Sequence, residues 1–509
     1  MMAVKLEAKP HKSKDDAINL LILVFIASLI GVYLIATTVL IAKDGIYYIE
    51  QAQKFTSDPI SVIKGHPSGY PFLIFIAHKF VTLFSDSSSP YTWIYSAQSV
   101  TLLCKMLALV PLYFLGKFLV GSKKSFWAIF ILLILPYPAR FGSDVLRDWP
   151  HVLFLAVGFL FLFFGVTKGK WWMFGIVGFV SGLGYMIRPE CAQLVIYGFL
   201  WLSTRSLLPK NKVSRFKLAI SLFVLLVGFA IPVIPYMKAR ERILPEKVKE
   251  LFVSPHQFQS DIIQEKDTTF LNSTYITAGT TGKIIEVSVK IIEELSDNLF
   301  YYFVPALFIG IYYRFSKKTV ITDAERFFLP AFVLLNIVMV VLLYCFWQYI
   351  SRRHCLPLTV FLIFYVPEGL DVLALWLRSR FSKAQLETNR HPRLFFFILL
   401  VIGLSICLPK LLRPLRLEKQ GYRDAAKWLR ENSKKGDTIA LQDKRISFYA
   451  ERKGLKYNKE IPKQAKYVVR IEENGTEEPD LGRTAKKEYS VLEDMRKKSE
   501  KKLVIYRIL

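Results

Sequence analysis

The sequence predicts a polytopic α-helical membrane protein, and two observations support this fold class. Of the 509 residues, 53% are hydrophobic and 15% are aromatic, and the mean hydropathy is +0.33. Long apolar runs recur along residues 18–412, and all but two or three of them are close to the about 20 residues that a helix needs to cross a bilayer. The net charge of +27 comes from basic clusters between these runs, which is typical of membrane-surface loops and argues against a nucleic-acid partner.

About eleven apolar runs qualify as candidate spans by length and composition. They cover residues 18–42, 91–116, 122–138, 149–167, 171–187, 191–204, 216–237, 297–313, 327–349, 355–377 and 394–412. A further run, Tyr70–Phe84, begins with a proline at its second position and is short for a crossing helix. The five cysteines lie in or beside apolar runs, so we expect buried free thiols and no disulfide framework.

Sidedness depends on whether Tyr70–Phe84 crosses, because each crossing reverses everything that follows it. If this run does not cross, most Lys and Arg residues of the short loops fall on one side, which the positive-inside rule makes cytoplasmic. We therefore predict a cytoplasmic tail at 1–17 and a transmembrane domain at 18–412. The first outer loop is then 43–90, and a long outer loop spans 238–295.

Residues 413–509 differ from the rest in composition, because they are rich in charge and contain no long apolar run. A helix is predicted near 421–433, and strands are predicted near 437–442, 466–471 and 502–508. These elements indicate a small extracytoplasmic α/β domain.

The first outer loop places a carboxylate at the mouth of the first span. Asp44 is followed by Tyr47 and Tyr48 at helical spacing, and then by the turn-rich stretch 64–71, which contains Lys64 and His66. A carboxylate held at this depth suits chemistry on a lipid-linked headgroup. The alternative is that Asp44 is the N-cap of a helix lying at the interface.

Further polar groups fall in the shorter outer loops. In the second, Asp144 and Asp148 are four residues apart, on one face if the stretch is helical, with Arg147 between them. The alternative is local, with Ser143 capping the next helix and Arg147 pairing with Asp144. The third and fifth outer loops contribute a short set of charged residues. These are Arg188, Glu190, Arg352 and Arg353.

This combination of groups fits the transfer of a sugar from a polyprenyl phosphate. Cations would stabilise the departing phosphate, and one carboxylate would accept the proton of the acceptor hydroxyl. Direct displacement would invert the anomeric centre. Two arginines on the outer face are contrary to the positive-inside rule, and a bound phosphate would offset the energetic cost of placing them there.

The same residues resemble a known family. Asp44-Gly45 with Tyr47-Tyr48, the HPSGYP stretch at 66–71, SDVLRDWP, Arg188-Pro189-Glu190 and RRHCLPL at 352–358 resemble the GT-C glycosyltransferases of the protein O-mannosyltransferase and aminoarabinose transferase type. The resemblance covers most of residues 18–410. It implies a GT-C-like fold whose first outer loop contains interfacial helices.

The resemblance also implies roles for individual residues. Asp44 would be the catalytic base, and Asp144 or Asp148 the second acidic position. The donor phosphate and sugar would contact the remaining candidates, which are Tyr47, Tyr48, Lys64, His66, Arg147, Arg188 and Arg353. Many relatives need no metal, so we expect no cofactor; a divalent site built from His66, Asp44 and the Asp144/Asp148 pair is the alternative.

The expected partners are a polyprenyl-phosphate sugar, a lipid, glycan or protein acceptor, and membrane lipids. We expect a multi-pass protein in a bacterial inner membrane, with the active site on the outer face. A transporter or flippase of lipid-linked saccharides is the rival hypothesis. It is less favoured because the spans show no repeat and Lys105 is the only strong mid-span charge.

Overall fold

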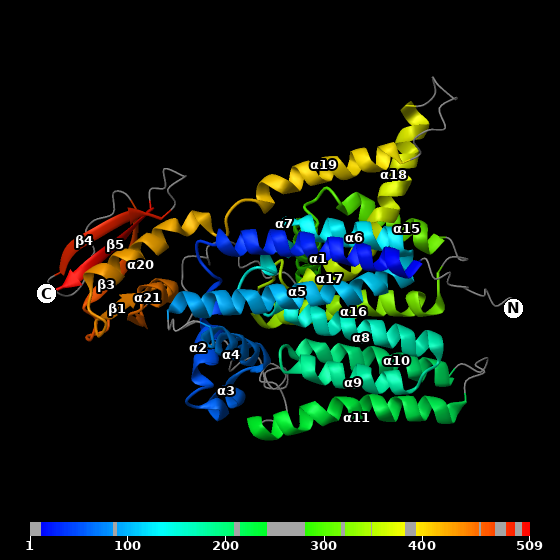
Figure 1. Ribbon diagram of the computed structural model, residues 1–509, viewed down its shortest axis with the longest axis horizontal. Coiled ribbons are helices and arrows are strands. Elements are labelled where there is room, and N and C mark those ends of the chain that lie inside the picture. Colours follow the sequence, from blue (N-terminus) through cyan, green and yellow to red (C-terminus); the bar gives the residue numbers. More distant parts are fainter. Residues whose placement is uncertain are drawn as a thin grey trace.

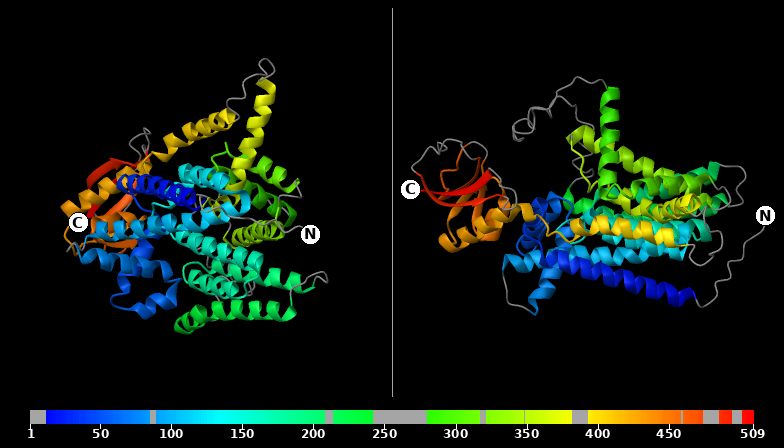
Figure 2. Two further views of the ribbon diagram at one scale, coloured as in Figure 1. Left: turned by 45° about the vertical axis from the view of Figure 1, so that its right-hand side comes forward. Right: turned by 90° about the horizontal axis from the view of Figure 1, so that it is seen from above.

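The protein is a bundle of long helices with a small sheet domain at one end (Figures 1 and 2). The computed structural model describes residues 12–84, 89–207, 214–241, 280–316, 321–347, 349–381, 393–457, 460–473, 485–493 and 501–509. Most of the predicted long outer loop, residues 242–279, lies outside these ranges, and its last part is the helix α14, Thr280–Asn298.

Every predicted span contains helix. The bundle comprises α1 (Lys12–Ala36), α5 (Pro90–Val120), α6 (Ser122–Ile134), α8 (Asp148–Lys168), α9 (Trp172–Tyr185), α10 (Gln193–Leu207), α11 (Arg215–Arg240), α15 (Val304–Ser316), α16 (Asp323–Trp347), α17 (Leu356–Leu362) continuing through a 3-10 turn into α18 (Val366–Phe381), and α19 (Leu394–Leu411). By length and composition, seven of the described helices are able to cross a membrane. The membrane fold class is confirmed, and the count of eleven crossings stays a prediction.

Close helix packing depends on small residues where backbones approach. A Cβ added at Gly178 of α9 would lie 2.1 Å from the Leu225 carbonyl oxygen of α11, and one added at Gly228 would lie 2.3 Å from the Gly175 carbonyl oxygen. Such small-residue contacts are the usual way in which membrane helices approach closely. In α5, Lys105 is fully buried with its Nζ 5.6 Å from the Trp149 ring centroid, so it faces the interior of the bundle.

Helices α1 and α5 run antiparallel, which fixes the path of the first outer loop. Asn19 Nδ2 donates to the Tyr113 hydroxyl at 3.1 Å, and near the other end Gln98 Nε2 donates to Thr38 Oγ1 at 3.2 Å. The chain therefore leaves α1 and enters α5 at the same end of the bundle. The intervening helices α2 (Lys43–Lys54), α3 (Pro59–Gly65) and α4 (Gly69–Thr82) gather at that end (Figure 1). This geometry agrees with a run at Tyr70–Phe84 that does not cross.

The C-terminal domain is a five-stranded sheet with two helices. After the short connection that follows α19 come α20 (Gln420–Asn432), β1 (Thr438–Leu441), α21 (Lys444–Ala450), β2 (Lys453–Lys456), β3 (Tyr467–Glu473), β4 (Ala485–Leu492) and β5 (Lys501–Ile508). The strand order is β2-β1-β3-β5-β4, with β1 parallel to β2 and β3, and β5 antiparallel to β3 and β4. The predicted helix and three strands are present. The sequence analysis missed β2, β4 and α21, and both missed strands are sheet edges.

The C-terminal domain packs directly on the first outer loop. The Ile41 N–H donates to the Tyr449 hydroxyl at 3.2 Å, and the Val39 N–H donates to the Leu415 carbonyl at 3.1 Å. One hydrophobic cluster includes Ile46 and Ile49 of α2 together with residues of α20, α21 and the sheet. The domain and the loop therefore share a core at the end of the bundle.

Candidate active site

Asp44 lies in the first turn of α2 with its carboxylate half-exposed. Its side chain is 48% exposed, and Oδ2 accepts a hydrogen bond from Arg353 Nη2 at 2.8 Å. The alternative that Asp44 is an N-cap is wrong, because α2 begins at Lys43 and Ala42 occupies the N-cap position. A carboxylate inside the first turn is still favoured by the helix dipole.

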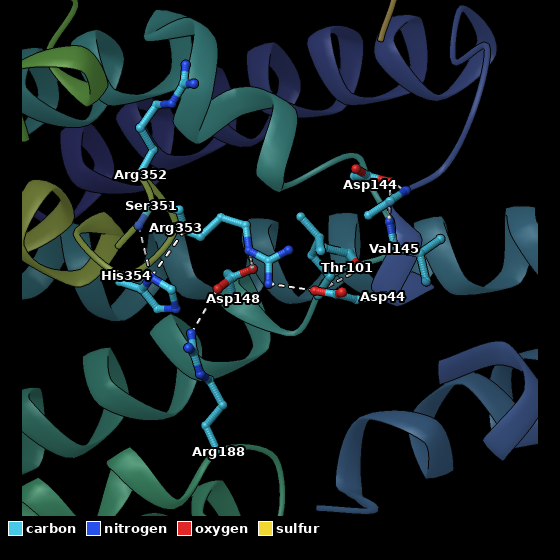
Figure 3. Close-up of polar contacts among 12 residues, drawn as sticks. Asp44, Thr101, Asp144, Val145, Asp148, Arg188, Ser351, Arg352, Arg353 and His354 are labelled. Carbon is cyan, nitrogen blue, oxygen red and sulfur yellow. Dashed lines mark hydrogen bonds and ion pairs between the residues drawn. The ribbon is translucent and has the colours of Figure 1, made fainter. Parts of the chain in front are cut away.

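Arg353 joins Asp44 to a second, buried aspartate. Asp148, the first residue of α8, is 1% exposed, and its Oδ2 lies 3.6 Å from Arg353 Nε. Its Oδ1 accepts a hydrogen bond from Arg188 Nη1 at 2.8 Å. Figure 3 shows the four side chains in a row, with Asp44 and Arg188 at its two ends. The structure thus brings together four of the predicted residues from four separate segments.

Asp144 does not belong to this row. Residues 142–147 are not helical, so the condition under which Asp144 and Asp148 would share a helix face is not met. Asp144 Oδ1 accepts from the Ala42 N–H at 3.0 Å, and Oδ2 accepts from Arg416 Nη2 at 2.5 Å. The predicted pairing of Asp144 with Arg147 is not formed. Asp144 instead ties the start of α2 to the chain that leads into the C-terminal domain.

The predicted tyrosines pack differently from each other. Tyr48 is 7% exposed and meets Tyr70 edge to face, with ring centroids 5.1 Å apart. The Arg147 guanidinium lies 5.9 Å from the centre of the Tyr48 ring, and its Nη1 donates to a backbone carbonyl at 3.4 Å. Tyr47 is less buried and contacts His66 edge to face at 5.3 Å. Burial raises the pKa of Tyr47 to about 12, so its hydroxyl remains a hydrogen-bond donor at neutral pH.

Lys64 and Arg352 point to other partners. Lys64 pairs with Glu241 at 2.5 Å, and both side chains are exposed. Arg352 lies 3.7 Å from Glu294 and 3.6 Å from Asp297, and it points away from the row (Figure 3). Carboxylates therefore face both Arg352 and Arg353. The fold does not need a bound phosphate to offset the cost of placing these two arginines on the outer face.

Electrostatics hold the network in a defined charge state. Burial alone would lower the pKa of Arg353. The Asp148 and Asp44 carboxylates raise it by more, so this pKa lies above the ordinary value for arginine. Burial would raise the pKa of Glu190, but Arg188 holds it well below the usual range. Burial, reinforced by Arg188, lowers the pKa of His354 to about 4. At neutral pH the site therefore combines charged arginines and carboxylates with a neutral imidazole.

A buried polar cluster lies next to Asp148, and His151 is the member of it that the sequence analysis missed. Five buried atoms there have no hydrogen-bond partner among the described residues: Asp148 Oδ2, His151 Nδ1 and Nε2, Arg188 Nε and Glu190 Oε2. Buried polar atoms are seldom left unpaired, so such a cluster indicates a place for water or for a polar ligand. The Arg188 and Glu190 side chains face each other at 3.7 Å, and their Arg-Pro-Glu sequence was the available signal. His151 had no comparable signal.

The described part of the chain contains no group of three or more His, Cys, Asp and Glu side chains placed to hold a metal ion. In particular, His66 contacts Tyr47, while Asp44, Asp144 and Asp148 are each engaged by an arginine. The alternative of a divalent site built from these residues has no support in this geometry.

Comparison with known proteins gives one family match and several structural relatives. Residues 66–236 match the family model described as dolichyl-phosphate-mannose-protein mannosyltransferase. That range includes Asp148 and Arg188, whereas Asp44 and Arg353 lie outside it. No curated protein sequence matches the chain.

Solved structures of two proteins share the fold over most of this chain. ArnT from Cupriavidus metallidurans in the apo state is 12% identical, with a TM-score of 0.56 over 96% of this chain and 97% of that one. The same protein bound to undecaprenyl phosphate gives a TM-score of 0.54. Archaeal oligosaccharyltransferase AglB from Archaeoglobus fulgidus, in complex with an inhibitory peptide and a dolichol-phosphate, is 13% identical with a TM-score of 0.52, over 91% and 70% of the two chains.

These relatives define a class for the fold. The chain shares the fold of ArnT and AglB, with a helical membrane domain and a small C-terminal sheet domain. The resemblance to the protein O-mannosyltransferase and aminoarabinose transferase type, predicted from short motifs, is confirmed by the family match and by this fold.

Proposed function

We propose that this chain is a membrane glycosyltransferase that moves a sugar from a polyprenyl-phosphate donor to a lipid, glycan or protein acceptor, with inversion and with Asp44 as general base. One observation carries the proposal. Asp44 is half-exposed at the end of the bundle, while Arg353 holds its carboxylate in a fixed place at 2.8 Å. An acceptor hydroxyl can therefore reach the carboxylate from solvent, where it would give up its proton as it attacks the sugar.

The donor side of the site is supplied by the arginines. Arg353 and Arg188 come from separate loops and meet at Asp148, so two permanent cations lie within reach of one anionic group. Positioned cations stabilise the charge that builds up on a departing phosphate. His151 and Glu190 have polar atoms without a partner among the described residues, and these atoms would form hydrogen bonds with the hydroxyls of a sugar bound next to the arginines.

The structural relatives support this donor class. One ArnT structure is bound to undecaprenyl phosphate, and the AglB structure contains a dolichol-phosphate. Both ligands are polyprenyl phosphates. We infer that the present chain takes a donor of the same chemical class, and that the reaction needs no metal ion.

The direct test is turnover of a panel of polyprenyl-phosphate sugars by the purified protein in detergent. A membrane extract supplies acceptors, and the released polyprenyl phosphate is quantified with and without a chelator. The proposal expects release from one donor, unaffected by the chelator, and a product whose anomeric configuration is opposite to that of the donor. If no donor is turned over but labelled lipid-linked saccharide crosses proteoliposome membranes, the transporter hypothesis replaces it.

The location of the site has its own test. We propose that the end carrying α2 and the C-terminal domain faces outward from a bacterial inner membrane, as the distribution of Lys and Arg predicts. The described native cysteines are all buried, so a cysteine placed at exposed Lys453 would be the reactive thiol of the C-terminal domain. A membrane-impermeant maleimide should label it in intact spheroplasts. Labelling only after lysis would reverse the assignment.

A further inference from the structure

A basic cleft lies between the C-terminal domain and the start of α5, apart from the Asp44 site. It has a volume of about 170 Å³, several times the about 30 Å³ that one water molecule occupies. It is lined by residues of α5, α20 and α21: Tyr91, Gln420, Arg423, Asp424, Ala426, Lys427, Arg430 and Tyr449. In Figure 1 the start of α5 lies beside α21 and near α20.

The charge of the cleft is positive. Arg423, Lys427 and Arg430 recur at helical spacing on the face of α20 that lines it. The one acidic residue of the lining, Asp424, accepts a hydrogen bond from Gln420 Nε2 at 3.1 Å. Lys427 is exposed and makes no ion pair with any residue that the structure describes, whereas Arg430 Nη1 lies 3.8 Å from Glu451 Oε1 in a pair that is partly exposed on both sides. A concave surface with three cations and one carboxylate selects an anionic ligand.

The cleft also lies where lipid headgroups would be. Tyr91 is in the first turn of α5, and tyrosines concentrate at membrane interfaces. Farther along the same helix, Tyr95, Leu103 and Leu107 are 48%, 51% and 50% exposed, as expected of a surface that faces lipid tails. A lipid whose chains lie along α5 would bring its headgroup to the same end of this helix as the cleft.

We propose that this cleft binds the phosphate headgroup of an anionic phospholipid, with the acyl chains along the exposed face of α5. Lys427 and Arg430 contact the phosphate, while Arg423 stays anchored. Arg423 Nη1 already donates to the carbonyls of Thr38 and Val39, at 3.1 and 3.2 Å.

Such a lipid would touch the segment that carries Asp44. Arg423 and Tyr449 line the cleft, and both also hold residues 38–41, three residues before Asp44. The bound headgroup therefore fixes the junction between the C-terminal domain and the first outer loop. This site is separate from the Asp44 network and does not depend on its chemistry.

The test is crosslinking of lipid from inside the cleft. The full chain, with the photoreactive residue p-benzoylphenylalanine in place of Gln420, is placed in phosphatidylcholine nanodiscs with an increasing fraction of phosphatidylglycerol. Mass spectrometry then identifies the crosslinked lipid. Lys427→Ala and Lys427→Ala/Arg430→Ala are compared with Lys453→Ala, which removes an exposed lysine on β2 outside the cleft. Melting curves verify that each variant is folded.

We expect phosphatidylglycerol to be the main adduct, and half-saturation to need about fivefold more of it for each cation removed. Lys453→Ala should leave half-saturation unchanged. Equal adducts with phosphatidylcholine, or half-saturation that is the same in the double variant, would overturn the proposal. Soluble glycerol phosphate should compete only weakly; if it abolishes the adduct at low concentration, the ligand is a soluble phosphate and the lipid assignment is wrong.

Discussion

Two aspartates in one loop, Asp144 and Asp148, have different roles although they are four residues apart. Both are at most 2% exposed and both pair with arginine. The two arginines that reach Asp148 come from the bundle loops, and one of them, Arg353, connects it to Asp44. The arginine that reaches Asp144 precedes the C-terminal domain. The role of each buried aspartate therefore depends on which distant arginine pairs with it.

Removing the charge of Asp148 should have the largest effect on stability. Asp148→Asn leaves Arg188 and Arg353 facing a neutral amide, and breaking a buried ion pair costs about 3 kcal/mol of unfolding free energy. Because the two arginines lose their common anchor, we also expect sugar transfer to slow about 10- to 100-fold, or about 1.4–2.7 kcal/mol. Denaturation in mixed micelles and the polyprenyl-phosphate release assay measure the two effects. Asp144→Asn is the matched control, and an equal loss of rate in it would remove the distinction between the two aspartates.

The unfolding free energy should depend on pH through His354, which lies near Asp148 and not near Asp144. The folded pKa of His354 is about 4, below the ordinary value of about 6.5, so between these values the unfolded chain binds a proton that the folded chain excludes. The stability that His354 contributes is therefore complete above about pH 6.5 and is lost as the pH falls toward 4. Between pH 7 and pH 5 we expect a loss of about 2 kcal/mol.

The control variant for this pH dependence is His354→Asn, because an asparagine side chain does not titrate between pH 5 and pH 7. Its unfolding free energy should change less than that of the wild type between pH 7 and pH 5. An identical pH dependence in both proteins would show that His354 is not held neutral in the folded state.

The coupling between Asp144 and Arg416 should be smaller but measurable. Asp144 is buried and Arg416 is 25% exposed, so we expect a coupling energy of about 1.5 kcal/mol in a double-mutant cycle with Asp144→Asn and Arg416→Gln. The pair Asp44 and Arg353 is more exposed, and its coupling in stability should stay below about 1 kcal/mol. The reverse order would mean that Asp44 has a structural role and Asp144 does not.

Lys64 should show the smallest effect. Its pair with Glu241 is exposed on both sides, and such pairs contribute about 0–1 kcal/mol. We expect Lys64→Ala to change the unfolding free energy by less than about 0.5 kcal/mol and to leave the KM for the donor within about twofold. A tenfold rise in KM would return Lys64 to the donor site.

Much of the fold was predictable because it depends on local patterns. Apolar runs gave the position of every bundle helix, and the alternating strands β1, β3 and β5 stood out because they form the buried middle of the sheet. The strands β2 and β4 were missed for the opposite reason. They are edges, with sequences KGLK and AKKEYSVL, whose lysines protect an exposed edge but hide its strand pattern.

The residues of the candidate site were singled out from the sequence, but their pairings were not. Asp44, Arg188 and Arg353 were singled out by short motifs, and the structure brings them together around Asp148. Nothing near Asp144 in the sequence indicates that Arg416 reaches it across the junction. The partner of Lys64 was also distant, 177 residues along the chain.

The most direct test of the central claim compares Asp44→Asn with Glu50→Gln in the release assay. Both carboxylates lie on α2, and each substitution removes one charge, so the two variants differ in whether the group faces Arg353. We expect Asp44→Asn to lower the rate of polyprenyl-phosphate release by about 10²- to 10⁴-fold, as for a lost general base, with Glu50→Gln near wild type and both variants folded. A folded Asp44→Asn protein that releases polyprenyl phosphate as fast as the wild type would contradict the assignment of Asp44 as the base.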